Sequence, residues 1–556
     1  MPFHEKAVKV LITPKIGDII WRILARYTMN YRSNYIKNLL LPCLAFSVTT
    51  GIFSALLIAL FKWAASRIIG LSGQIYAFVR TDPRFFPLLI VAFALLGLIV
   101  SFILSYSHSC RGGGIPTSIA AIRGHTSFHW IKSALLLPVS ALSTFLCGIP
   151  LGNEGPSVQM GAAIGRGTVR LIGSKKDAGW NRYIMTGGAA AGFAAATGAP
   201  ITAILFSMEE VHRRFSPLLF SVASISVIVS QLISRVLAGF GIGTLGLFHI
   251  SNLPSLPLES CFIPIAVGLA CGICAVFFTR AYNGFDKLIR EKLGKVSLRI
   301  KLPVIFALTA IIGFFSAEMI GSGHDLVELI FERSFTWYLL VLFFLVRAIM
   351  LMVSNTVGVT GGVFLPTLAF GAIIGALLSE AFIALGVLGE EYHVLIVCLG
   401  MASFLGATSR VPVMASIFAV EVLGGMSNVL SVIISVTCAF LVIELSGMDD
   451  FCDTVIKTKT KSLHAGRTAH TVKVTLTVAE DAFARDKEMR DILWPSSCVL
   501  LSIEKGPNHG DGLGIAVLDK LTVHYTTHDP ERTADELISL LGTQDEATNA
   551  IMRSAK

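Results

Sequence analysis

The sequence has few charged residues and no cysteine pattern that suggests disulfide bonds or a metal site. Only 15% of its 556 residues are charged, against about 25% in soluble proteins. This shortage excludes a single soluble enzyme, a disordered protein and a nucleic-acid binder. The ten cysteines are scattered, and the CxxC of Cys271 and Cys274 lies in an apolar run, where small buried helix residues are expected. We expect no metal and no cofactor.

The charged residues are concentrated at the C-terminal end. The 104 residues from Asp453 onward hold 28 of them, whereas long apolar runs recur through the preceding part, the first at about 39–66. Runs of this length can span the lipid bilayer. The sequence therefore predicts a multi-pass membrane domain at 35–456, followed by a separate domain at 457–556.

The N-terminal arm, residues 1–34, is basic, and no secretory signal is visible because charges interrupt residues 1–37. The basic residues near the first span are Lys6, Lys9, Lys15, Arg22, Arg26, Arg32 and Lys37. Positive charge beside a first span predicts a cytoplasmic N-terminus. An amphipathic arm on the membrane surface is the alternative, and it implies the same side.

The membrane domain contains an internal repeat. GNEGPSVQMGAAIG (152–165) aligns with GVFLPTLAFGAIIG (362–375), and residues 188–210 align with 400–422 at nearly the same offset. Two segments repeated in one order indicate two homologous halves, about 35–240 and 255–450. The residues alone leave open whether the halves are parallel or inverted.

Three glycine-rich breaks interrupt the apolar runs, namely GGGIP (112–116), GNEGP (152–156) and GGVFLP (361–366). A break before a helix exposes backbone N–H groups that can hold an anion. Glu154 lies inside the second break. When ionised it would fill such a site, and when protonated it would admit a free anion. Helix capping is the alternative for Glu154, and tight turns or helix packing for each glycine motif alone.

Two adjacent glutamates end the apolar helix of FSMEEVHRRF (206–215). Glu209 recurs as Glu421 in the repeat, so we expect a structural role for it. Glu210 corresponds to Val422 and breaks the symmetry. Glu210 is therefore the better candidate for passing protons, although ion pairing at a helix end is the alternative.

The tail is predicted to be a small α+β domain. Alternation and β-branched residues predict strands at 473–478, 497–506 and 518–527. Residues 481–492 and 531–542 are predicted to be helices.

The order of GGGIP, GNEGP, FSMEE and GGVFLP resembles the CLC family of chloride channels and chloride/proton antiporters over residues 35–456. The resemblance implies an all-α polytopic membrane fold of two inverted halves with broken helices, and a homodimer. It also implies that Glu154 is the gating glutamate and Glu210 the proton relay. The anion-binding residues that it implies are Gly113, Gly114, Ile115, Asn153, Gly155, Val363, Phe364, Leu365 and Cys452.

Three of these positions depart from the family pattern. Gly113 stands where the family has a serine, and Asn153 where it has a basic residue. Cys452 stands where the family has a pore-lining tyrosine, unless a shift of one residue places Phe451 there. These departures bear on anion preference and on the tightness of coupling.

The tail resembles the C-terminal RCK (TrkA-C) domain of prokaryotic ion transporters at about 470–545. This resemblance implies a cytoplasmic, dimeric module that senses a small molecule or nucleotide. A passive dimerisation domain is the alternative.

The sequence thus predicts a bacterial inner-membrane exchanger of chloride, or a similar monovalent anion, for protons, with both termini cytoplasmic. A passive anion channel is the nearest alternative, favoured by the missing tyrosine and disfavoured by Glu210. A cation transporter lacks support because no cation filter motif is present, and a sensor would not need Glu154.

Overall fold

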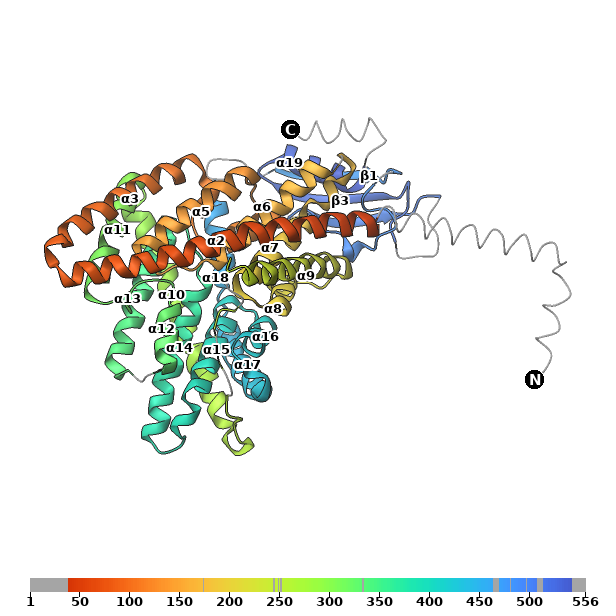
Figure 1. Cartoon of the computed structure of the whole chain (residues 1–556). Helices are drawn as coiled ribbons and strands as arrows, with labels where there is room; N and C mark the ends of the chain where they lie inside the picture. The colour runs from red at the N-terminus through yellow and green to blue at the C-terminus, as the bar shows by residue number, and fades with distance from the viewer. Residues whose placement is uncertain are drawn as a thin grey trace, which may run out of the picture.

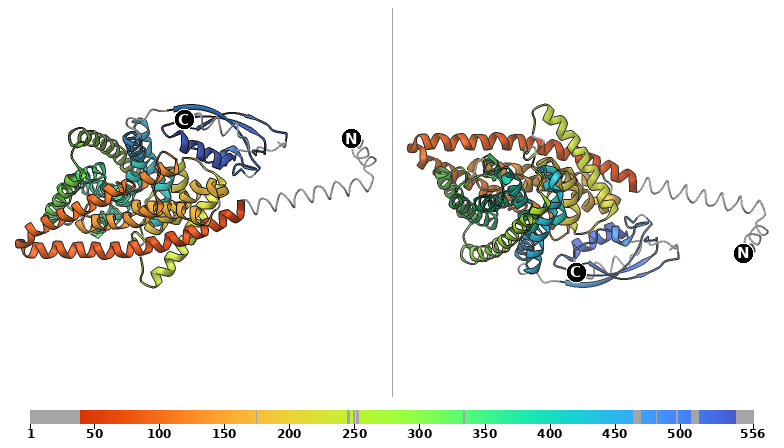
Figure 2. Two further views of the ribbon diagram at one scale, coloured as in Figure 1. Left: turned by 90° about the horizontal axis from the view of Figure 1, so that it is seen from above. Right: turned by 90° about the horizontal axis from the view of Figure 1, so that it is seen from below.

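The computed structural model describes residues 39–173, 175–243, 246–248, 250, 253–332, 335–463, 470–480, 482–496, 498–507 and 514–542. The basic arm predicted at 1–34 lies outside these residues. The described part consists of a large helical domain and a small α+β tail that packs against one face of it (Figures 1 and 2).

Within the described residues, nine helices are long and apolar enough to cross a membrane. The helices of this domain are α2 (Leu41–Thr81), α3 (Phe86–Tyr106), α4 (Ile115–Ile122), α5 (Trp130–Cys147), α6 (Glu154–Ile172), α7 (Asn181–Thr197), α8 (Pro200–Phe206), α9 (Pro217–Gly239), α10 (Phe262–Leu293), α11 (Leu298–Phe315), α12 (His324–Glu332), α13 (Trp337–Val357), α14 (Phe364–Ala384), α15 (His393–Ser409), α16 (Pro412–Val422), α17 (Val429–Leu445) and α18 (Phe451–Leu463). Large apolar side chains remain exposed on the outer helices, for example Phe102, Leu232 and Phe277. Such exposure suits helices that face lipid.

Glycines bring paired helices into backbone contact in each half. A β-carbon at Gly161 of α6 would overlap the carbonyl of Gly188 in α7, and the reverse also holds. In the second half, Gly371 of α14 and Gly400 of α15 meet in the same way. The predicted repeat therefore corresponds to equivalent helix pairs that pack through small residues, as expected inside a membrane.

Glu209 joins the first half to the second. Its carboxylate accepts hydrogen bonds from the backbone amides of Val413 and Met414, at 3.0 and 2.6 Å, in the first turn of α16. An anion at a helix N-terminus satisfies amides that have no partner within the helix and complements the helix dipole.

Glu421 makes the reciprocal connection. It accepts from the amides of Ile201 and Thr202 in the first turn of α8, both at 2.9 Å, and from the Thr202 hydroxyl at 2.7 Å. The structural role predicted for Glu209 is confirmed, and each half completes a helix of the other.

The tail contains a three-stranded antiparallel sheet of order β1-β3-β2 and one helix. Its elements are β1 (His470–Thr477), β2 (Cys498–Glu504), β3 (Lys520–Thr527) and α19 (Pro530–Leu541). The three predicted strands and the second predicted helix are confirmed.

The helix predicted over 481–492 is wrong. Its described residues form turns and a short 3-10 turn at Met489–Asp491. The apolar residues of this segment do not line one face of a helix. They contact other elements of the structure. The ring of Phe483 packs against Trp180 and Tyr183 of the membrane domain, with ring centroids 5.3 and 5.5 Å apart.

Candidate functional site

The side chain of Glu154 is fully buried at the first position of α6. Among the described residues, neither of its carboxylate oxygens completes a hydrogen bond. A β-carbon at Gly152 would overlap Oε2 and would lie 3.2 Å from the Cβ of Leu365, whose amide in the first turn of α14 faces the carboxylate. The carboxylate thus lies between the N-termini of two helices, where a free anion would be favoured.

The three glycine-rich breaks converge beside Glu154. Gly152 and Gly362 exchange two backbone hydrogen bonds of 2.7 Å, which join the second break to the third. A β-carbon at Gly114, whose φ is +69°, would overlap the carbonyl of Gly155, which joins the first break to the second. Only glycine permits this approach, so the starts of α4, α6 and α14 meet through bare backbone.

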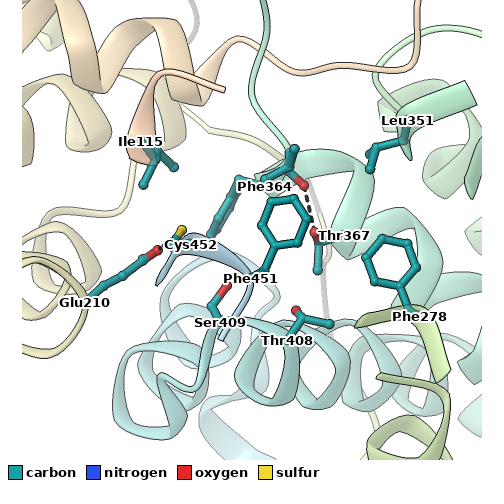
Figure 3. A pocket seen from close by; sticks show the side chains of 11 residues that line it. Ile115, Glu210, Phe278, Leu351, Phe364, Thr367, Thr408, Ser409, Phe451 and Cys452 are labelled. Carbon is teal, nitrogen blue, oxygen red and sulfur yellow. Dashed lines mark hydrogen bonds between the residues drawn. The ribbon is translucent and has the colours of Figure 1, made fainter. Parts of the chain in front are cut away.

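An inner cavity lies between this region and Glu210 (Figure 3). Its lining includes six residues that the sequence singled out: Ile115, Val363, Phe364, Glu210, Phe451 and Cys452. The amides at the start of α14 and the predicted proton glutamate therefore share one cavity.

Glu210 is buried in a π-helical turn, Ser207–His212, that continues α8. The thiol of Cys452 donates a hydrogen bond to its Oε1 at 3.1 Å, and the two side chains point toward one another in Figure 3. Arg123 holds the backbone of this turn, because its guanidinium donates to the carbonyls of Glu210 and Val211, both at 2.8 Å. The sequence left open whether Cys452 or Phe451 faces the pathway, and both line the cavity.

Asn355 is a site residue that the sequence analysis missed. A β-carbon at Gly113 would lie 3.5 Å from its Nδ2, which is buried and, among the described residues, has no hydrogen-bond partner. The hydroxyl of Tyr282 donates to its Oδ1 at 2.9 Å. This bond fixes the amide with its donor side toward Gly113. The short polar stretch 354–356 at the end of the apolar helix α13 was the signal that could have revealed it.

Two lysines were also missed, of which Lys62 is buried and Lys459 half-buried. Lys62 of α2 donates to the carbonyls of Ala195 and Ala196, at 3.2 and 2.9 Å, and its charge acts on Glu154. Lys459 of α18 donates to the carbonyl of Arg111 at 2.7 Å, next to the first glycine-rich break. A lysine within an apolar helix such as α2 is costly and is by default functional. Both lysines supply positive charge near the proposed pathway. Asn153 has the opposite effect, because it stands where the family pattern has a basic residue.

One group of side chains in the described part has the composition of a cation site. Ligand atoms of His324, Asp325 and Glu328 lie within 4.8 Å of one another, but the two acidic residues are exposed. His324 Nε2 already pairs with the carbonyl of Leu247 at 2.6 Å. Exposed acidic groups of this kind are ordinary at helix N-termini and carry no metal assignment.

The long apolar helices and the convergent helix starts define a polytopic membrane protein built to place backbone amides at its centre. Residues 94–444 match the family model described as voltage gated chloride channel. Because this match covers more than half of the chain, the protein belongs to the voltage-gated chloride channel (CLC) family. It is accordingly an anion transport protein and not an enzyme.

Solved structures share the fold. A slow cyanobacterial Cl⁻/H⁺ antiporter has a TM-score of 0.69 at 21% identity, covering 75% of this chain and 98% of that one. A CLC-type fluoride/proton antiporter has a TM-score of 0.59 at 19% identity, covering 72% of this chain and 95% of that one. A eukaryotic CLC transporter has a TM-score of 0.62 at 20% identity, covering 76% of this chain and 74% of that one.

These comparisons confirm the predicted all-α, CLC-type fold. The family match ends before the tail. The small C-terminal sheet is present, and its likeness to an RCK domain stays a prediction.

Proposed function

We propose that the protein exchanges a monovalent anion for protons. The observation that carries this proposal is the presence of two buried glutamates that both approach the start of α14. Glu154 lies bare among the helix starts, and Glu210 lies in the wall of the inner cavity that reaches the start of α14. A channel needs a path for anions but has no need of a second buried carboxyl group.

In this mechanism Glu154 alternates between two states. Ionised, it occupies the position beside the amide of Leu365 and excludes the transported anion. Protonated, it no longer competes, and an anion takes its place among the amides. Each exchange of anion for carboxylate thus moves a proton with Glu154, while Glu210, in the wall of the inner cavity, receives and releases protons.

In the same proposal Asn355 supplies a donor that Gly113 lacks. Its Nδ2 is aimed at the space that a serine side chain at this position would occupy. An N–H donor to an anion is a strong hydrogen bond. The anion itself is chloride or a similar monovalent ion. One relative of the same fold is a chloride and another a fluoride antiporter, so both ions belong in the test.

The test uses purified protein in liposomes under an anion gradient, with anion flux and external pH recorded together. We expect uphill proton movement in the wild type. Glu210→Ala should abolish proton movement and leave anion flux, and Glu154→Gln should conduct anions without coupling. Runs with chloride and with fluoride give the anion preference. Anion flux without proton movement in the wild type would contradict the proposal.

A passive channel is the second candidate, and one observation favours it. Cys452 is much smaller than the tyrosine of the family pattern, and it lines the inner cavity. A smaller side chain leaves less of a barrier at the inner end of the pathway, so anions would pass without waiting for Glu154. Cys452→Tyr should tighten coupling if leakage through this cavity limits it, and should leave an already tight exchanger unchanged.

We further propose a homodimer in a bacterial inner membrane, on the basis of the family resemblance. The basic arm before the first span supports cytoplasmic termini. The tail then serves as a cytoplasmic module beside Glu210. Chemical crosslinking in native membranes and protease accessibility of the tail in inverted vesicles test these points.

A further inference from the structure

A second cavity lies where the tail meets the ends of α6 and α7. Its charged lining residues are Arg166 of α6, Arg182 of α7, and Arg532 and Glu536 of α19. Both parts of the protein therefore contribute to it.

The cavity carries more positive than negative charge. Glu536 is its one lining carboxylate among the described residues, and two arginines share it. Arg182 forms an ion pair with Glu536 Oε2, and Arg532 Nε donates to Oε1 at 3.2 Å. Three guanidinium groups against one carboxylate leave an excess of two positive charges in a partly buried place.

Arg166 is the least compensated of the three. Its Nη1 donates to the carbonyl of Phe128 at 2.8 Å, and its guanidinium lies 5.7 Å from the centre of that ring. Its Nε is buried and, within the described part of the chain, makes no hydrogen bond. A buried guanidinium donor without a partner is costly unless a ligand satisfies it.

We propose that this junction cavity binds the phosphate group of a soluble small molecule. The planar guanidinium fork matches phosphate geometry, and two negative charges would balance the excess. A single chloride ion would balance only half of it. The inference does not depend on whether the protein is an exchanger or a channel.

Binding here would act on the transport pathway through Arg123. Arg532 donates to the carbonyls of Gly124 and Thr126, the latter at 3.0 Å, and Ser496 donates to the carbonyl of Arg123. The side chain of Arg123 in turn holds the turn that carries Glu210. A ligand that fixes Arg532 against α6 therefore fixes the segment that positions the proposed proton relay.

The experiment titrates pyrophosphate into full-length protein in phospholipid-free detergent micelles and records the heat of binding. Arg166→Gln should weaken binding at least about tenfold, because a charge-assisted hydrogen bond is lost. Arg170→Gln is the matched control. It removes an exposed arginine one turn further along α6, and binding should stay within about twofold of the wild type, as expected for screened surface charge.

A second variant covers the case in which Arg166→Gln does not fold. Ser539 lines the cavity on α19, so Ser539→Glu places a tethered carboxylate among the arginines. This variant should bind no pyrophosphate and should unfold at a higher temperature than the wild type. Absence of pyrophosphate binding to the wild type, or unchanged binding by Arg166→Gln or Ser539→Glu, would overturn the site. Binding that leaves the anion flux of reconstituted wild-type protein unchanged would overturn its regulatory role.

Discussion

Glu209 and Glu210 are neighbours in the chain, yet the structure predicts opposite consequences of neutralising them. Glu209 accepts two backbone hydrogen bonds at the start of α16. Glutamine keeps one acceptor oxygen but loses the charge. Its side-chain NH₂ group then faces the second backbone N–H, so two donors oppose each other. A charge-assisted hydrogen bond contributes about 1.5–3 kcal/mol and the helix dipole about 0.3–1 kcal/mol. We expect Glu209→Gln to cost about 2–4 kcal/mol of stability and to leave proton coupling intact.

Glu210→Gln should do the reverse. The amide oxygen can still accept the thiol hydrogen bond of Cys452, and removal of a buried ionisable group relieves its desolvation. We expect a stability change within about 1 kcal/mol and a loss of coupled proton movement. Thermal unfolding in detergent gives stability, and flux with external pH in liposomes gives coupling.

A control for this pair lies in the other half of the protein. Glu421 accepts the equivalent backbone bonds at α8, plus the hydroxyl of Thr202. Glu421→Gln should therefore destabilise at least as much as Glu209→Gln and should spare coupling. The reasoning is refuted if Glu209→Gln keeps full stability while proton movement stops.

Three further predictions concern separate parts of the structure. Gly114→Ala should prevent folding because its β-carbon would overlap the carbonyl of Gly155, whereas Gly113→Ala meets only neighbours at 3.5 Å or more and should yield folded protein by size-exclusion chromatography. Asn355→Leu should weaken anion binding about tenfold in calorimetry through loss of one donor to an anion, and unchanged affinity would remove Asn355 from the site. Burial lowers the pKa of Lys487 to about 8, against about 10.4 in an unfolded chain. The unfolded state therefore binds more protons between these values, so tail stability should rise with pH across that window in denaturant titrations. Lys487→Met should flatten this rise, and an unchanged slope would contradict the assignment.

The sequence revealed the parts of the site that depend on local backbone. Glycine-rich breaks before apolar helices indicate exposed amides wherever the rest of the chain lies, and Glu154 stands inside one of them. The repeat distinguished the structural role of Glu209 from the proposed proton role of Glu210, because Glu209 recurs in the second half and Glu210 does not. These signals need no knowledge of which helices meet.

The residues that were missed act across large sequence separations. Asn355 is oriented by Tyr282, 73 residues earlier, and Lys459 meets the carbonyl of Arg111 across 348 residues. A single polar residue in an apolar run does not identify its partner. The wrong helix at 481–492 has the same origin, because Phe483 packs against α7 and its neighbouring turn, and tertiary contact overrides local propensity.

The crossed contacts of Glu209 and Glu421 also bear on how the chain is made. The first turn of α8 obtains its carboxylate from a residue 220 positions later, and α16 obtains its own from one 204 positions earlier. During synthesis the first half therefore enters the membrane with amides at the start of α8 that nothing yet satisfies. Such amides cost several kcal/mol each in lipid. We therefore expect the anion pathway to assemble when the ribosome releases the chain, and not when the individual helices insert. A nascent chain on a ribosome stalled before residue 421 should still be cut by proteases near α8.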